Sequence, residues 1–163
     1  MSVTGNDAGA APGRLLRMTL QVYANKKNKP EDNEAFAREY LAKVAEIDAR
    51  NGMEAYQQVY TPPPYRTALE EMSRARNRGW VVDDHDITVE FYFRSFKELE
   101  RVRADPDFQT LQAGEGPYVN LVHTVASLGW VERHVDGGKV VNVKDGKSTY
   151  PPWGELMDLS TAG

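Results

Sequence analysis

The chain has 163 residues, with 40% hydrophobic and 27% charged residues and a formal net charge of −4. This composition indicates one folded domain and not a disordered or fibrous chain. The acidic balance argues against a nucleic-acid partner, which usually needs a basic surface. The absence of cysteine excludes a disulfide framework, a thiolate metal site and a cysteine nucleophile. No apolar run reaches the roughly 18 residues of a membrane span, and we expect a cytoplasmic protein without a membrane partner.

The two ends of the sequence differ from its middle. Residues 1–13 are small and polar and lack a signal-peptide pattern, so we expect a flexible N-terminal arm. Residues 144–163 contain Pro151-Pro152 and acidic residues, and we expect a C-terminal tail whose Trp153 and Leu156 could dock on the domain or on a partner subunit. The folded domain is expected over residues 14–143.

Four segments alternate apolar and polar residues with period two, which predicts β-strands. They are Leu15–Tyr23, Glu54–Tyr60, Asp86–Phe93 and Leu121–Val131. Gly137-Gly138, between two short alternating stretches, is a hairpin signal that leads to Val143.

Helical spacing of apolar residues separates these strands. It covers Glu31–Asn51 and Arg66–Asn77, and a third helix follows Ser95, which forms a capping box with Glu98. Pro106 begins another short helix. The order predicts a ferredoxin-like βαββαβ fold, an antiparallel sheet with helices on one face and an extra C-terminal hairpin.

The second face of such a sheet carries polar and aromatic side chains where lysine and glutamate would be usual. We place there Arg17, Thr19, Gln21, Tyr23, Tyr56, Gln58, Tyr60, Thr88, Glu90 and Tyr92. Aromatic surface of this kind usually meets another surface. Two sheets facing each other in a homodimer would enclose a pocket for a small aromatic substrate. The alternative is a purely structural interface in which the tyrosines only pack.

Three stretches together resemble the EthD family of dimeric α+β barrel proteins, and especially its small fungal members found beside polyketide synthases. They read RLLRMTLQVY…EAFAREYLAKV, DHDITVEFYFRSFKELERVRADPDF and EGPYVNLVHTVASLGWVERHVDGGKVVNV. The resemblance implies a homodimer without metal or organic cofactor. Fungal members of this group act as dehydratases or decarboxylases on aromatic polyketide intermediates. Other barrel relatives are cofactor-free oxygenases, and some bind haem.

The first helix departs from the family pattern. Many relatives have a His-Ala-Pro turn about five residues after its aromatic residue, and counting from Tyr40 this sequence has Val44-Ala45-Glu46. If that histidine is the family acid–base, this protein uses another residue or performs different work.

Candidate acid–base residues are therefore Glu90, His123 and His85. Burial of Glu90 in an aromatic cavity would raise its pKa towards that of a general acid, although an ion pair with Arg17 is the structural alternative. His123 lines the cavity only if the register of the last strand turns it inward. His85, between two aspartates, is either an acid–base group at the cavity mouth or a solvated turn residue.

The remaining side chains are assigned to binding or to the surface. The polar-face tyrosines could stack on a flat polyphenol and donate to its oxygens, or only pack at the dimer seam. Residues 61–84 form a long connection whose arginines and Trp80 could act as a cationic lid or as a solvated helix face. His134 is expected at the surface.

Motifs for other chemistries are absent. The sequence has no G-x-S-x-G nucleophile elbow, no nucleotide-binding glycine motif and no helical pair of metal-ligating residues. The sequence therefore predicts a cofactor-independent lyase, a dehydratase or decarboxylase of an aromatic polyketide-type compound. A cofactor-free oxygenase and a non-catalytic binding dimer remain the alternatives.

Overall fold

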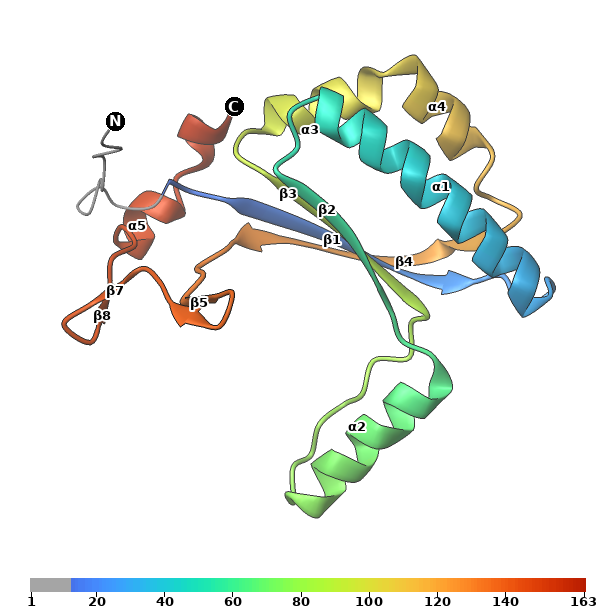
Figure 1. Cartoon of the computed structure of the whole chain (residues 1–163), viewed down its shortest axis with the longest axis horizontal. Coiled ribbons are helices and arrows are strands. Elements are labelled where there is room, and N and C mark those ends of the chain that lie inside the picture. Colours follow the sequence, from blue (N-terminus) through green and yellow to red (C-terminus); the bar gives the residue numbers. More distant parts are fainter. Residues whose placement is uncertain (1–12) are drawn as a thin grey trace, which may run out of the picture.

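The computed structural model describes residues 13–163, apart from the side chain of Leu121. Residues 1–12 of the expected N-terminal arm lie outside the described residues. The model contains a four-stranded antiparallel sheet with the strand order β2-β3-β1-β4 (Figure 1). Its strands are β1 (Leu16–Ala24), β2 (Ala55–Tyr60), β3 (Ile87–Phe93) and β4 (Val119–Trp130). This order confirms the predicted ferredoxin-like α+β fold.

Helices α1 (Pro30–Arg50), α3 (Phe96–Ala104) and α4 (Pro106–Ala113) lie along one face of this sheet (Figure 1). The predicted capping box at the start of α3 is present, because the Ser95 side chain accepts from the Lys97 amide and Glu98 accepts from the Ser95 amide. The opposite face of the sheet is left without a helical layer.

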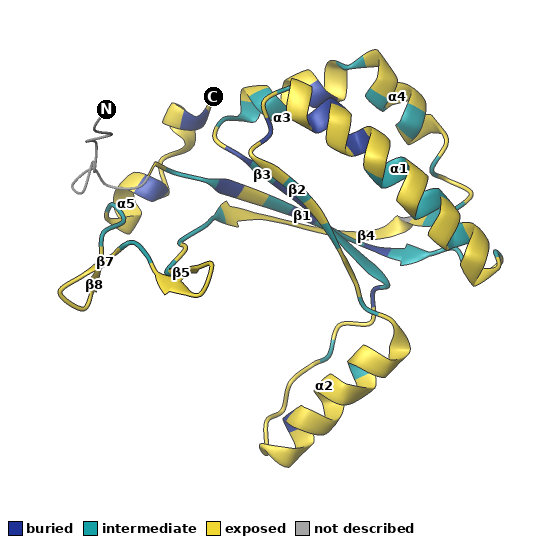
Figure 2. Ribbon diagram, in the orientation of Figure 1, coloured by how far each residue is buried: buried dark blue, intermediate teal, exposed yellow. Residues whose placement is uncertain are grey.

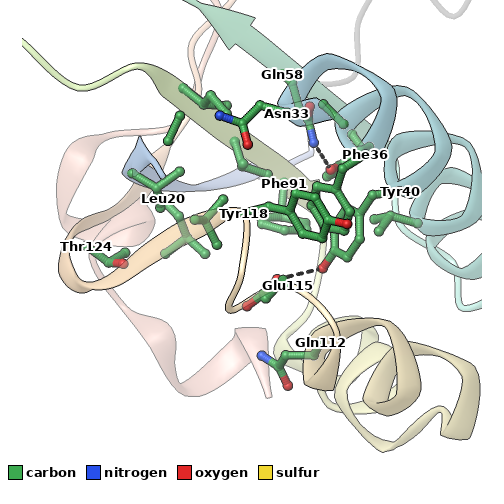
Figure 3. Close-up of a pocket in the computed structure, with 18 of the residues that line it drawn as sticks. Leu20, Asn33, Phe36, Tyr40, Gln58, Phe91, Gln112, Glu115, Tyr118 and Thr124 are labelled. Carbon is green, nitrogen blue, oxygen red and sulfur yellow. Dashed lines mark hydrogen bonds between the residues drawn. The ribbon is translucent and has the colours of Figure 1, made fainter. Parts of the chain in front are cut away.

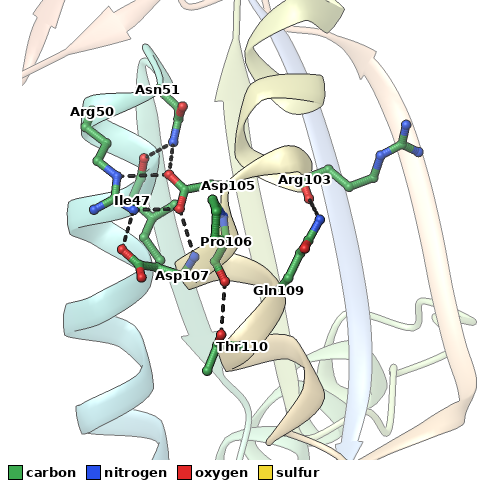
Figure 4. Close-up of polar contacts among 9 residues, drawn as sticks. All are labelled: Ile47, Arg50, Asn51, Arg103, Asp105, Pro106, Asp107, Gln109 and Thr110. Carbon is green, nitrogen blue, oxygen red and sulfur yellow. Dashed lines mark hydrogen bonds and ion pairs between the residues drawn. The ribbon is translucent and has the colours of Figure 1, made fainter.

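The end of α1 is tied to the start of α4 by one aspartate. Asp105 caps α4 through the Asp107 amide, and the Arg50 guanidinium donates to both of its carboxylate oxygens at 2.9 and 2.6 Å (Figure 4). The Asn51 amide adds a further bond at 2.9 Å. These bonds, with Arg50 first, lower the pKa of Asp105, so its charge is held at neutral pH. These bonds therefore hold the end of α1 and the start of α4 at a fixed separation.

The hydrophobic core lies between the sheet and these helices (Figure 2). Its buried members come from β1, α1, the α1–β2 connection, β3 and α3, with one residue near the C-terminus: Leu16, Ile47, Met53, Phe91, Phe93, Val102 and Ala162. Phe93 and Ala162 are fully buried. The alternation in β1 and β3 thus turns one set of side chains into the core, as the sequence pattern predicts.

Helix α2 (Pro63–Ala75) projects away from the rest of the domain (Figure 1). Ser73 is the only buried residue of this helix. Apolar side chains on α2 and on the segment that follows it are exposed, among them Tyr65, Leu69, Met72 and Trp80. The helix predicted over Arg66–Asn77 is present and begins three residues earlier, because Pro63 suits the first turn of a helix.

The C-terminal residues form short elements that pack back on the domain. They are β5 (Val135–Asp136), β6 (Lys139–Val140), β7 (Val143–Lys144), β8 (Lys147–Ser148), α5 (Trp153–Leu156) and the 3₁₀ helix Leu159–Ala162. The β5–β6 pair is the predicted hairpin, and β7–β8 is a second one. Leu156 is buried and Arg14 donates to its carbonyl oxygen at 3.1 Å, so this segment docks on the start of β1. Within residues 13–163, no helix has the length and apolar character needed to cross a membrane.

Candidate active site

A cavity of about 150 Å³ lies between the sheet and helices α1 and α4 (Figure 3). Its walls are mostly aromatic and aliphatic. The aromatic residues that line it are Phe36, Tyr40, Tyr56, Phe91, Phe108 and Tyr118, and the polar ones are Asn33, Gln58, Gln112, Glu115 and Thr124. Apolar walls with a few convergent polar groups are typical of a small-molecule site.

One face of α1 builds a complete wall of this cavity. Asn33, Phe36, Ala37, Tyr40 and Val44 recur at intervals of three and four residues, which places them on one side of the helix. The ring of Phe36 stacks on Tyr118, with a centroid distance of 4.0 Å and nearly parallel planes. The apolar stripe of α1 that the sequence pattern predicts is therefore also the wall that a ligand in the cavity would contact.

Tyr40 and Glu115 form a polar pair inside this aromatic wall. The Tyr40 hydroxyl donates to Oε2 of Glu115 at 2.9 Å (Figure 3). Burial raises the pKa of Glu115, and the hydrogen bond from Tyr40 lowers it. The effect of burial is the larger of the two, so the pKa of Glu115 is raised. Burial and the nearby carboxylate also raise the pKa of Tyr40, so its hydroxyl keeps its proton. The pair can hold and deliver a proton at the cavity wall.

A second polar chain runs along β2. The Gln58 amide donates to the Tyr56 hydroxyl at 2.6 Å, and the Tyr60 hydroxyl donates to Oε1 of Gln58 at 2.5 Å. Burial is the main cause that raises the pKa of Tyr56. Tyr56 is therefore a neutral phenol in the cavity wall, and its own hydroxyl hydrogen can be donated to an oxygen of a ligand.

Asp48 lies one turn beyond the cavity-lining Val44 on α1. It is 2% exposed, and neither of its carboxylate oxygens has a hydrogen-bond partner within residues 13–163. Burial raises the pKa of Asp48 to about 7. An ionised Asp48 would raise the pKa of both Tyr40 and Tyr56. Among the described residues that line the cavity there is no Lys, Arg or His, so the ionisable side chains that line it are all acids.

The position expected to carry the family's histidine faces this cavity. Val44 is 1% exposed and lines its wall. Val44 brings no titratable group to this wall, and the carboxyl group that lines the cavity comes from Glu115, in the loop after α4.

The strand register corrects the predicted placement of three binding residues. Tyr56, Gln58 and Tyr60 pair with Phe91, Val89 and Ile87, so they share the helix-covered face and not the open one. The prediction that they lie on the open face is wrong. It assumed that the other side of β2, with Ala55 and Val59, faces the helices. Neither side of this strand is uniformly apolar, so the pattern alone does not show which side is buried. Tyr56 and Gln58 line the cavity, and the Tyr60 side chain lies near its mouth.

The open face carries the other predicted cluster, centred on Glu90. This residue is 9% exposed, and its carboxylate accepts from Gln57 and from the Tyr92 hydroxyl, the latter at 3.0 Å. Arg17 lies 3.5 Å away as an ion-pair partner, and Thr19 hydrogen-bonds Ser127 beside it. Arg17, Thr19, Glu90 and Tyr92 thus gather as predicted, in a cluster whose polar groups are already paired.

The histidines lie apart from both clusters. The His85 ring is buried, its Nδ1 lies 2.5 Å from Oδ1 of Asp83, and Tyr23 stacks on it at 4.4 Å. The Tyr23 hydroxyl in turn donates to Asp84 at 2.6 Å. His123 is exposed on β4, next to Thr124, whose side chain lines the cavity. No hydrogen bond or ion pair in the described part of the chain joins His123 to Glu90.

The residues around His85 also bring potential metal ligands together. Ligand atoms of Asp83, Asp84 and His85 lie within 4.8 Å of one another. Their carboxylates already accept from His85, from Tyr23 and, at 2.8 Å, from the amide of Gln21. This network accounts for the acidic cluster as a fixed turn just before β3.

The two remaining predictions concern exposed residues. Trp80 is 46% exposed on the segment that returns from α2, and it does not line the cavity. His134 is partly exposed, 3.6 Å from a Glu132 oxygen, with its ring edge-on to Tyr150. The sequence analysis did not single out Glu115 or Tyr40 as site residues. Tyr40 lay on a recognised helical stripe, whereas Glu115, between two glycines, carried no periodic signal.

Comparison with known proteins identifies the family of this chain. The profile of the EthD domain family matches residues 28–121, and this range contains most of the cavity-lining residues. The chain belongs to the EthD domain family. It is 41% identical over 146 residues to a protein of Aspergillus terreus named "Putative oxygenase", with 88% of this chain and 91% of that protein covered.

Two further relatives of this EthD family member bear a different enzyme name. It is 24% identical to "Conidial pigment biosynthesis dehydratase EthD" of Metarhizium robertsii, covering 80% of this chain and 92% of the relative. It is 27% identical to "Dehydratase aurZ" of Gibberella zeae, covering 80% and 86%. A solved structure from Bacteroides fragilis, described as a dimeric protein of unknown function with a ferredoxin-like fold, aligns with a TM-score of 0.50 and 6% identity, covering 70% of this chain and 93% of that one. That likeness supports the fold alone.

Proposed function

We propose that this EthD protein is a dehydratase that eliminates water from a hydroxylated aromatic polyketide-type compound in the cavity between the sheet and α1. The observation that carries the proposal is the Tyr40–Glu115 pair, a half-buried carboxyl group beside a neutral phenol in an aromatic cavity. Two of the named relatives are dehydratases.

The chemistry needs one proton donor and one proton acceptor. In the proposed step Glu115, whose pKa burial raises, acts in its protonated form and gives its proton to the leaving hydroxyl group as the carbon–oxygen bond breaks and water departs. The resulting carboxylate takes the proton from the neighbouring carbon, whose electron pair forms the new double bond, and Glu115 is restored. Tyr40 positions the carboxyl group, and Tyr56 can donate to a carbonyl oxygen of the substrate.

The acidic character of the cavity favours elimination over oxygenation. An oxygenase without a cofactor depends on an electron-rich, anionic substrate that itself reacts with oxygen. No cationic side chain among the described lining residues would stabilise such an anion, whereas the carboxyl group of Glu115 can protonate a leaving group.

A cofactor-free oxygenase is the second candidate, and the name of the 41% identical relative favours it. The test is a mass-resolved incubation of purified protein, without added cofactor, with hydroxylated anthrones and naphthopyrones in air and under nitrogen. Loss of water in both atmospheres supports the dehydratase. A gain of oxygen in air alone establishes the oxygenase, loss of CO₂ a decarboxylase, and tight binding without turnover a binding protein.

We further propose that the open face of the sheet is the interface of a homodimer. It exposes Val59 by 44% and Val125 by 49%, around the polar cluster of Glu90 and Arg17. Pairing two such faces would cover this apolar surface and leave each helix-side cavity within its own subunit. Light scattering coupled to size exclusion tests the proposal: Val125→Asp should yield monomers, and an unchanged dimer would overturn it.

A further inference from the structure

Helix α2 and the segment that returns from it form an arm, residues 63–82, on the side of the sheet away from α1, α3 and α4 (Figure 1). Arg66 fixes the base of this arm, because its guanidinium pairs with Asp86 at 3.0 Å and donates to the Asp84 carbonyl at 2.9 Å. The Ser73 hydroxyl ties the far end together by donating to the Arg78 carbonyl at 2.6 Å. The arm therefore has a defined shape and a fixed base.

Beyond its base, the arm makes no polar contact with its own domain. Within residues 13–163, no hydrogen bond or ion pair joins residues 67–82 to the rest of the chain. The ribbon of α2 is accordingly exposed along almost its whole length (Figure 2). The α2 helix has 13 residues, a length that is marginal in water without packing of its apolar face.

That apolar face is present and uncovered. Tyr65, Leu69 and Met72 recur at intervals of four and three residues, which places them on one side of α2. Their exposure lies between 41% and 72%, and Val81 on the returning segment is 98% exposed. Contiguous exposed apolar side chains of this kind mark a contact with another surface.

The charge of the arm indicates the chemistry of that surface. Residues 73–81 contain no acidic residue and three exposed arginines, Arg74, Arg76 and Arg78. None of the three has an ion-pair partner in the described part of the chain. Glu70 and Glu71 lie earlier on the helix, so the positive charge is at the far end of the arm. The whole chain has a net charge of −4, so a second copy attracts this end, whereas two such ends repel each other.

The position of the arm places a second copy within its reach. Val59, 44% exposed on the open face of the sheet, lies in the strand that leads directly into α2. At 1.5 Å per residue the helix is about 20 Å long, about twice the 10 Å that separates two packed sheets. A subunit seated on the open face would therefore lie alongside the arm.

We propose that the α2 arm is a clasp of the homodimer. Its apolar stripe of Tyr65, Leu69 and Met72 packs against the body of the second copy, meaning every part of that copy except its own arm, and its three arginines face acidic side chains there. Two-fold symmetry forms this contact twice. The clasp rests on the open-face dimer proposed above, and it is independent of the proposed reaction because it uses no residue of the cavity.

The first test is the dissociation constant of the dimer, measured by sedimentation over a range of protein concentrations. Leu69→Asp should raise it by at least about tenfold, because an apolar side chain is lost from two copies of the contact. Thr67→Asp adds the same charge to the opposite, exposed side of α2, and should leave it close to the wild-type value. Arg76→Gln should make dimer formation less sensitive to salt than it is in the wild type.

The second test locates the arm directly. Met72 is replaced by the photoreactive amino acid benzoylphenylalanine, and protein with natural nitrogen is mixed with protein labelled with ¹⁵N. After irradiation, mass spectrometry of the cross-linked peptides should show light–heavy pairs that join position 72 to the body of the other subunit.

The outcomes separate the clasp from the proposals on which it depends. A dimer whose dissociation constant is the same in the wild type, Leu69→Asp and Thr67→Asp would overturn the clasp and leave the open-face dimer standing. Cross-links confined to one subunit, or joining two arms, would also overturn it. A monomeric wild type would overturn both interface proposals. If Leu69→Asp abolished binding to vesicles of phosphatidylserine and left the dimer unchanged, the arm would be a membrane contact instead.

Discussion

Asp48 makes the stability of the domain depend on pH in a way that one substitution can reveal. Its carboxyl group is buried without a partner, and burial raises its pKa from 3.8 to about 7. The folded state therefore holds this proton more tightly than the unfolded state does. Between these two pKa values the folded protein binds more protons, so the free energy of unfolding falls as the pH rises.

The size of the effect follows from the pKa difference. A shift of about 3 units at 1.36 kcal/mol each corresponds to about 4 kcal/mol over the whole window. From about pH 5 to about pH 8 the loss amounts to about 2 to 3 kcal/mol. Asp48→Asn keeps the shape of the side chain and removes the titrating group. The free energy of unfolding of this variant should therefore lack this part of the pH dependence.

The assay is urea unfolding of the wild type and of Asp48→Asn at several pH values in this range. The difference between their free energies of unfolding cancels the other titrating groups, and it should shift by about 2 to 3 kcal/mol in favour of the variant as the pH rises. Glu46→Gln, on the exposed side of the same helix, is the matched control. Parallel curves for wild type and Asp48→Asn would refute the reasoning, because they would mean that Asp48 ionises freely in the folded state.

Three further predictions concern the site and the core. Tyr40→Phe removes the hydrogen bond that lowers the pKa of Glu115, so the high-pH limb of the pH–rate profile for water loss should move to higher pH; a limb in its original place would contradict the assignment. Ser95→Ala should lower the free energy of unfolding by about 1 kcal/mol in urea, and no change would mean that the capping box contributes nothing. Phe93→Ala, at a fully buried position, should cost about 3 to 5 kcal/mol, measured in the same way, and a loss below about 1 kcal/mol would argue against its place in the core.

The sequence predicted the fold well where periodicity and caps agreed. The alternation of β1 and β3 has an apolar face and a polar face, so register and burial follow from the pattern. The capping box of Ser95 and Glu98 located the start of α3. Each of these signals depends on residues close together in the chain, which is why they could be read without the structure.

The candidate site was less predictable because its location depends on contacts between distant segments. On β2, both faces mix small, polar and aromatic residues, and only pairing with Phe91 shows that Tyr56 turns towards the helices. Glu115 lies 75 residues from Tyr40 in a loop flanked by glycines, so no local pattern joins them. The buried Ala162 likewise gives no signal, because a small residue near a chain end has no periodicity of its own.

The central claim is that Glu115, and not the open-face Glu90, is the acid of the reaction. It is tested most directly by comparing the rate of water loss, as kcat, for the wild type, Glu115→Gln and Glu90→Gln on one turned-over compound. Both changes replace a carboxyl group, half-buried in Glu115 and 9% exposed in Glu90, with an isosteric amide, so the chemical change is matched. Glu115→Gln should lower kcat by about 10²- to 10⁴-fold while Glu90→Gln stays close to the wild type. A large loss in Glu90→Gln with near-normal turnover in Glu115→Gln would contradict the account and move the active site to the open face of the sheet.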